Sequence, residues 1–383
     1  MLALSFYAGA MELQSDTWRL ALAARTPGLD AARLAAVARA GDGLELLERP
    51  DTGLLAALGL TTAALTWLNT PDHASVEADL RWLESSGCTL LASTDPGYPE
   101  LLRQSPDAPA VLYVRGDPSL LAEPQLAMVG SRNPTAGGRA TARDFAASFA
   151  RLGLAITSGL ALGIDAACHD GALGAGGVTI AVLACGLDTV YPAEHASLAQ
   201  RIAESGVLVT EFPPGTVPLA AYFPQRNRII AGLSHGTLVV EAAQRSGSLI
   251  TARLAGLAGR EVFAIPGSIH NPLSRGCHAL IRQGAKLVEC VDDVLVELKI
   301  SLSSQLLAAP GPTPAAARKE GPALDKAYEI LLDALAFEPA SVDSLIERTG
   351  LTSESIASML LILELDGHVA PHPGGRYSRM AGR

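Results

Sequence analysis

A short loop of residue types that bind anions directly follows an apolar stretch in the middle of the chain. Leu126–Val129 is long enough for a buried strand, and Gly130, Ser131 and Arg132 come next. A glycine lets the backbone approach an anion closely, while a serine hydroxyl and an arginine guanidinium donate hydrogen bonds to a phosphate. The sequence continues Asn133-Pro134-Thr135, so the G-x-G-x-x-G fingerprint of dinucleotide-binding proteins is absent. By itself the tripeptide fits a plain turn as the default, and the missing fingerprint argues against an NAD site.

Three further loops of small and polar residues fall at or near the ends of predicted strands. They contain Thr157-Ser158-Gly159, Arg245-Ser246-Gly247-Ser248 and Gly267-Ser268. The second of them opens a predicted helix, whose free N–H groups and dipole favour a phosphate. One such loop by itself is usually a tight turn, but four on one edge of a sheet fit a polyanion better. The serines and glycines of 158–159 and 246–248 are therefore candidate binding residues.

The segment Phe223-Pro224-Gln225-Arg226-Asn227-Arg228 combines an aromatic ring with two cations. Arginines that pair with phosphates and a ring that stacks on an unpaired base are typical of single-strand binding. The alternative is a solvated helix start with Phe223 in the core. We favour a binding segment in which Phe223, Arg226, Asn227 and Arg228 contact the ligand.

Patterns for catalysis or metal binding are weak. The histidines of the central segment show no i, i+4 pairing, which argues against zinc. Gly232-Leu233-Ser234-His235-Gly236 matches the G-x-S-x-G pattern of a hydrolase elbow, but it leads into a predicted strand instead of following one. No G-x-x-x-x-G-K-[ST] loop is present, which argues against a Walker-type ATPase. The sequence thus predicts no catalytic residue, no metal site and no cofactor.

Alternating strands and helices must position these loops. The predicted strands are 126–129, 154–156, 178–183, 207–209, 237–240 and 262–265, and helices are predicted over 136–152 and 164–173. Continuous Val, Ile and Leu strands that alternate with helices indicate a mostly parallel sheet covered on both faces. We therefore expect an α/β fold with a doubly wound, Rossmann-like sheet. The ligand crevice of such a sheet lies beyond the carboxyl ends of its strands.

Other regions flank the predicted sheet. Residues 1–90 are predicted to form a small helical domain, similar to a SAM or helix-hairpin-helix module, and residues 91–300 the Rossmann-like DNA-binding domain. Residues 301–322 are rich in Pro, Ala and Ser and are typical of a linker. Residues 323–383 are predicted to contain three helices, the second capped by Ser341, and a Gly-Gly hairpin. That order predicts a winged-helix-like domain.

Composition and charge narrow the classes of protein further. The chain has 383 residues, of which 49% are apolar and 18% charged, and this excludes extensive disorder. Its net charge is −10, yet residues 127–288 hold 13 basic and 9 acidic side chains. No apolar run is long enough to span a bilayer, the first residues lack the basic start of a signal peptide, and the five cysteines form no C-x-x-C pair. We expect a cytoplasmic protein without membrane contact.

These segments together resemble the DNA-processing protein A family, also called DprA or Smf. The resemblance covers residues 95–300 and rests on Met128–Arg132, Thr157–Asp165, Phe223–Ile230, Val240–Ala243, Ser246–Ala252 and Ile265–Gly267.

The resemblance implies a protein that binds single-stranded DNA entering during natural transformation, or competence. Members of this family protect that strand, load the RecA recombinase onto it and act as homodimers, with no established catalysis or cofactor. Carried over by motif, Arg132 would pair with a backbone phosphate, and Phe223 would be offered to a base. Residues 226–228 would line the same groove, and residues 246–248 would close it from a helix N-terminus.

An enzyme is the main alternative. Phosphoribohydrolases of the lysine-decarboxylase-like type use a similar sheet with the signature P-G-G-x-G-T-x-x-E. Here residues 233–241 lack the Pro-Gly-Gly, and Glu241 falls one residue late. In a strand this displacement would turn the carboxylate to the other face. A third alternative is an interaction scaffold with incidental DNA contact.

The C-terminal module is acidic. From Ala323 to Arg383 it has 9 acidic and 5 basic side chains, and its third predicted helix, 353–365, contains Glu354 and Glu364 but no basic residue. Phosphates would repel such a helix. We therefore expect this module to contact another protein or to have a regulatory role, instead of binding duplex DNA through that helix.

Overall fold

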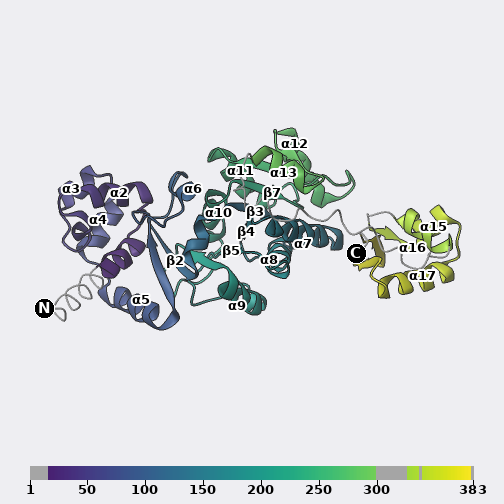
Figure 1. Ribbon diagram of the computed structural model, residues 1–383, viewed down its shortest axis with the longest axis horizontal. Helices are drawn as coiled ribbons and strands as arrows, with labels where there is room; N and C mark the ends of the chain where they lie inside the picture. Colours follow the sequence, from purple (N-terminus) through teal and green to yellow (C-terminus); the bar gives the residue numbers. More distant parts are fainter. Residues whose placement is uncertain (1–15, 299–325, 336–338, 381–383) are drawn as a thin grey trace.

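The computed structural model describes residues 16–298, 326–335 and 339–380, and a nine-stranded sheet forms its centre (Figure 1). The strand order is β1-β2-β6-β5-β4-β3-β7-β8-β9. The strands β6-β5-β4-β3-β7-β8-β9 are parallel to one another. Strand β2 is antiparallel to both of its neighbours, β1 and β6. The strands are β1 (Cys88–Ala92), β2 (Val111–Gly116), β3 (Gln125–Val129), β4 (Ala155–Ser158), β5 (Thr179–Val182), β6 (Val207–Thr210), β7 (Gly236–Val239), β8 (Glu261–Ala264) and β9 (Lys286–Leu287).

Helices bury both faces of the sheet, as its continuous apolar strands require. Ala127 and Val129 of β3 pack in the core formed with α10, α11 and α12, whereas Leu126 and Met128 pack in the core formed with α7, α8 and α13. This alternation follows from the two-residue period of a strand. The helices after β2 are η2 (Pro118–Ala122), α7 (Ala136–Arg151), α8 (Ile164–Gly174), η3 (Ala193–His195), α9 (Ala196–Ser205), α10 (Tyr222–Leu233), α11 (Ser248–Leu257), η4 (Pro272–Ser274), α12 (Arg275–Arg282) and α13 (Val291–Leu298).

The direction of chain progression reverses at β3. Strands β4, β5 and β6 follow on one side of β3, and β7, β8 and β9 follow on the other. In doubly wound sheets this switch point is where a crevice forms outside the carboxyl ends of the strands. The predicted fold class, a doubly wound and mostly parallel α/β sheet, is confirmed.

The edges of the sheet were not predicted. The antiparallel pair β1 and β2 and the short strand β9 extend it beyond the parallel strands. The boundary placed at residue 90 falls within β1, whose Cys88 pairs with Arg115 of β2. The sheet therefore begins two residues before that boundary.

The region before the sheet is helical, as expected. Residues 16–25 are helical. Asp30, Asp51, Thr61 and Asp72 each cap a later helix by accepting a hydrogen bond from a backbone N–H three residues ahead. The elements that follow are α2 (Ala31–Arg39), η1 (Gly43–Leu47), α3 (Thr52–Ala57), α4 (Thr62–Asn69), α5 (His73–Ser86) and, between β1 and β2, α6 (Glu100–Arg103).

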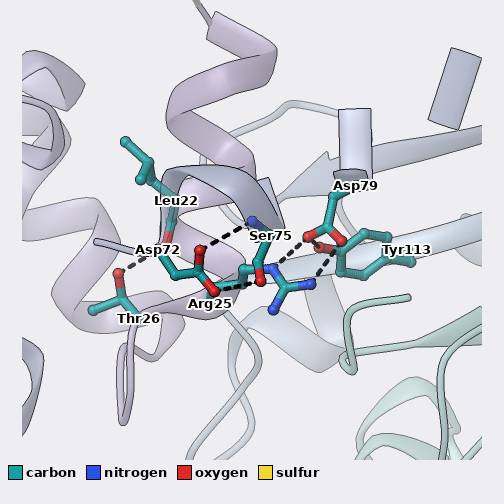
Figure 2. A network of polar contacts seen from close by, with 7 residues as sticks. All are labelled: Leu22, Arg25, Thr26, Asp72, Ser75, Asp79 and Tyr113. Carbon is teal, nitrogen blue, oxygen red and sulfur yellow. Dashed lines mark hydrogen bonds and ion pairs between the residues drawn. The ribbon is translucent and has the colours of Figure 1, made fainter. Parts of the chain in front are cut away.

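A partly buried ion pair joins these helices to the sheet (Figure 2). Arg25 donates from Nε and Nη2 to the two carboxylate oxygens of Asp79 on α5, over 2.6 and 2.7 Å. The hydroxyl of Tyr113 on β2 donates to the same carboxylate over 3.4 Å. The hydrogen bond with Asp79 raises the pKa of Arg25, and burial raises the pKa of Tyr113. The network thus holds the helix of residues 16–25, helix α5 and strand β2 against one another.

The C-terminal module has the predicted order of elements. They are α15 (Lys326–Leu335), β10 (Ala340–Ser341), α16 (Val342–Thr349), α17 (Ser353–Leu365), β11 (Val369–His372) and β12 (Arg376–Arg379). Ser341 caps α16, Gly350 ends it with a left-handed φ of 67°, and the strands form a β10-β12-β11 sheet. The linker predicted over 301–322 lies outside the described residues. Within the described parts of the chain, no helix is both long and apolar enough to cross a bilayer.

Candidate nucleic-acid interface

A cavity of about 770 Å³ lies at the switch point, beyond the carboxyl ends of β3 and β7. Its walls come from the loop after β3, the first turns of α10 and the start of α11. The sequence-predicted residues that line it are Gly130, Ser131, Arg132, Phe223, Arg226, Asn227, Ser246, Gly247 and Ser248. The fold therefore brings together three segments that are far apart in the sequence.

The loop after β3 is held on both sides by backbone hydrogen bonds. The N–H of Ser131 donates to the carbonyl of Glu241 over 2.7 Å, and the N–H of Ile164 donates to the carbonyl of Ser131 over 3.1 Å. A Cβ on Gly130 would lie 2.6 Å from Cγ1 of Ile164, so glycine is required for this close approach. The loop is thus fixed before any ligand arrives.

Arg132 extends from this loop across an aromatic ring. Its guanidinium carbon lies 5.1 Å from the centroid of the Phe223 ring, in the range of a cation–π contact. Phe223 is half-buried on α10, and the ring of Tyr191 lies 5.7 Å from it at an angle of 58°. Arg132 itself is exposed, so a cation and two rings border one cavity.

The start of α11 supplies the third wall. Gly247 is its N-terminal cap, and Ser246 and Ser248 on either side share a hydrogen bond of 2.7 Å between their hydroxyls. The first-turn N–H groups already have acceptors: Ser248 donates to the Ser246 hydroxyl over 3.3 Å, and Leu249 and Ile250 donate to the carbonyls of Ser246 and Gly247. The positive end of the helix dipole still favours an anion here. This wall therefore presents two hydroxyls and the positive end of a helix dipole to the cavity.

Arg226 is buried beneath the cavity, with only 3% of its surface exposed. Its Nη1 donates to the carbonyl of Gly159 over 2.6 Å and also to the carbonyl of Val182. Burial lowers its pKa to about 10, which Asp165 opposes, so the guanidinium is charged at neutral pH. Arg226 thus ties α10 to the ends of β4 and β5 and contributes only part of its side chain to the cavity.

The structure does not bring Ser158, Gly159 and Arg228 to the cavity lining. Ser158 is buried and donates its hydroxyl to the carbonyl of Met128 over 2.6 Å. Arg228 forms an ion pair with Glu211 and donates to the carbonyl of Asp107. The role predicted for Arg228 in lining the groove is therefore at odds with this geometry. Contact of the remaining candidates with DNA stays a prediction.

Asp165 and Tyr191 also line the cavity, although neither was among the predicted binding residues. Asp165 accepts hydrogen bonds from the backbone N–H groups of Gly159 and Ala161, over 3.1 and 3.4 Å. Burial raises the pKa of its carboxyl, while Arg226 and these two N–H groups lower it. Tyr191 lies on the loop after β5, where no motif pointed to it.

The features behind the enzyme alternatives lie elsewhere. The carboxylate of Glu241 accepts hydrogen bonds from the backbone N–H and the hydroxyl of Thr135, over 2.9 and 2.6 Å, and borders a separate cavity of about 250 Å³. Ser234 is fully buried and donates to the carbonyl of Ile230. Among the described residues, no group of three or more His, Cys, Asp or Glu side chains could hold a metal.

Fold and cavity together define a doubly wound α/β protein with a cavity at its switch point. A family profile described as DNA recombination-mediator protein A matches residues 89–299, and one described as the DprA winged helix domain matches residues 305–375. The chain belongs to this family of DNA-processing, recombination-mediator proteins, DprA or Smf. The predicted family is confirmed, and so is the winged helix at the C-terminus.

Relatives and solved structures agree with this assignment. Protein Smf of Escherichia coli K12 is 44% identical over 327 residues, which cover 85% of this chain and 86% of Smf. The X-ray structure of DprA from Streptococcus pneumoniae matches with a TM-score of 0.62 and 38% identity, covering 73% of this chain and 95% of the other. DprA from Helicobacter pylori, whose structure describes a single-stranded DNA binding mode, matches with a TM-score of 0.50 and 30% identity, over 55% and 95% of the two chains.

Proposed function

We propose that this chain binds single-stranded DNA at the switch-point cavity. We further propose that it protects incoming DNA during natural transformation and loads RecA onto it, acting as a cytoplasmic homodimer without catalysis. The observation that carries DNA binding is the exposed guanidinium of Arg132 over the Phe223 ring, opposite the start of α11. RecA loading is supported by the family alone, and it would be contradicted if the protein failed to speed RecA filament formation on a protein-coated single strand.

Single strands suit this cavity better than a duplex. Its donors are a guanidinium and hydroxyls beside the positive end of a helix dipole, which bind phosphates and read few base edges. Its rings can stack only on a base that is free of its complementary strand. The single-stranded DNA binding described for the Helicobacter pylori relative supports the same choice.

We expect the protein to bind single strands more tightly than duplexes of the same length, with little sequence preference. Because phosphate contacts release counterions, the logarithm of affinity should fall by about 0.7 per phosphate contact for each tenfold rise in salt. Fluorescence anisotropy with labelled single-stranded and duplex oligonucleotides at several salt concentrations measures the preference for single strands and the salt dependence of the affinity. Equal affinity for the two forms of DNA, or affinity indifferent to salt, would contradict the proposal.

The winged-helix domain is proposed to contact protein instead of supplying most of the DNA affinity. On α17, Glu354 and Glu364 accompany the exposed apolar side chains Leu361, Ile362 and Leu365, a surface that phosphates do not favour. We expect a chain ended at residue 300 to keep most of its single-strand affinity in the same assay. If the shortened protein stays folded and dimeric but no longer binds single strands, the winged-helix domain itself contacts DNA and this proposal is wrong.

A further inference from the structure

The aromatic ring most open to a ligand at the cavity belongs to Tyr191 and not to Phe223. Tyr191 is 49% exposed, whereas Phe223 is half-buried on α10. The guanidinium of Arg132 lies over the Phe223 ring, and Tyr191 packs beside that ring at an angle. Phe223 therefore already has two partners, while Tyr191 has ring surface to offer.

The loop that carries Tyr191 is tied to its surroundings on both sides. Before it, the N–H of Gly186 donates to the carbonyl of Thr216 over 3.0 Å. After it, the imidazole Nδ1 of His195 contacts the carbonyl of Leu160 over 2.8 Å. A ring on such a loop is held in place before binding, so stacking on it costs little ordering of the protein.

We propose that Tyr191 is the platform on which a DNA base stacks while Arg132 holds an adjacent phosphate. The assignment rests on the proposed single-strand binding and identifies the residue that contacts a base of the bound DNA. Base–aromatic stacking is tolerant of sequence because every base has a π face, which agrees with the weak sequence preference expected here. In this arrangement Phe223 positions both neighbours: it lies under the guanidinium and beside the tyrosine.

The test compares two ligands that share a backbone and differ in bases. One is an oligothymidine, and the other is an oligonucleotide of equal length made of abasic sites, so both carry the same phosphates. Stacking on one base is lost when its aromatic partner becomes alanine, so Tyr191→Ala should weaken oligothymidine binding by about 5- to 100-fold. The same variant should leave the affinity for the abasic strand unchanged.

Matched variants separate stacking from other effects. Tyr191→Trp keeps a ring and should retain wild-type affinity, whereas Tyr191→Leu keeps only apolar bulk and should behave like alanine. Leu257→Ala removes another exposed apolar side chain, 65% exposed on α11 outside the cavity lining, and should change neither affinity. Quenching of 2-aminopurine in the strand should be lost with Tyr191→Ala and kept with Tyr191→Trp.

The failure of this assignment differs from the failure of the proposed function. If the wild type binds oligothymidine and Arg132→Ala weakens that binding, but Tyr191→Ala does not, the platform lies elsewhere and the assignment alone is wrong. Equal losses by Tyr191→Ala on both strands would also overturn it, because the residue would then act through the backbone or the fold. A wild type that binds neither strand overturns both proposals.

Discussion

Replacing Arg226 by methionine should lower the free energy of unfolding by about 3–5 kcal/mol, the usual cost of leaving a buried charge without a compensating opposite charge. Methionine has similar length but leaves the carbonyls of Gly159 and Val182 without their donor. It also leaves the carboxylate of Asp165 buried without the opposite charge that lowers its pKa. Urea unfolding followed by circular dichroism measures the loss.

A double variant tests the cause of that loss. In Arg226→Met with Asp165→Asn, the uncompensated carboxylate is gone, so part of the stability should return and the two effects should not add. Strict additivity would show that Asp165 and Arg226 do not interact, and unchanged stability of Arg226→Met would show that the guanidinium bonds contribute nothing net. Arg226→Lys keeps the charge but lacks the planar fork, so it should restore stability only in part.

The same variant should weaken DNA binding even where the protein remains folded. Arg226 connects α10 to the ends of β4 and β5, and α10 carries Phe223 and Asn227 into the cavity. A first turn of α10 that is free to shift would no longer present these side chains together. Arg226 therefore acts through its neighbours, and its effect on affinity should reach abasic and normal strands alike.

The arginines of α10 show what the sequence could and could not predict. The sequence motif predicts one binding surface from Phe223 to Arg228, but residues two apart on a helix do not share a face. Phe223, Arg226 and Asn227 are spaced by three and four residues and all line the cavity, whereas Arg228 points to Glu211. Helical periodicity applied to the motif would have excluded Arg228 beforehand.

Other parts of the fold and site depended on information that the sequence alone does not display. The central strands were predictable because each is a continuous apolar run buried on both faces. Strands β1 and β2 pair antiparallel and are joined by a connection that holds only the short helix α6, so they fall outside the strand–helix alternation that predicted the parallel sheet, although Val111–Val114 of β2 is itself a buried apolar run. Tyr191 reaches Phe223 only because the ends of neighbouring strands converge, and an isolated tyrosine on a loop carries no motif.

Arg132→Ala should weaken single-strand binding by about 1–3 kcal/mol, because it removes a charge-assisted hydrogen bond to a phosphate. The side chain is exposed and its loop is fixed by backbone bonds of Ser131, so stability should be unchanged. Losing one phosphate contact should also reduce the slope of log affinity against log salt by about 0.7. Anisotropy titrations at several salt concentrations, with melting curves of both proteins, measure these quantities.

Two matched variants decide whether position or mere charge is responsible. Arg151→Ala removes another exposed arginine, in the last turn of α7 and outside the cavity lining, so it should lower affinity far less than Arg132→Ala. Arg132→Lys keeps the charge but loses the planar contact with Phe223 and should give an intermediate affinity. Equal losses of single-strand affinity in the two alanine variants would mean that DNA binding depends only on the net charge of the basic central segment. The switch-point cavity would then not be the binding site, because a specific guanidinium at the end of β3 would have no advantage over one at the opposite end of α7.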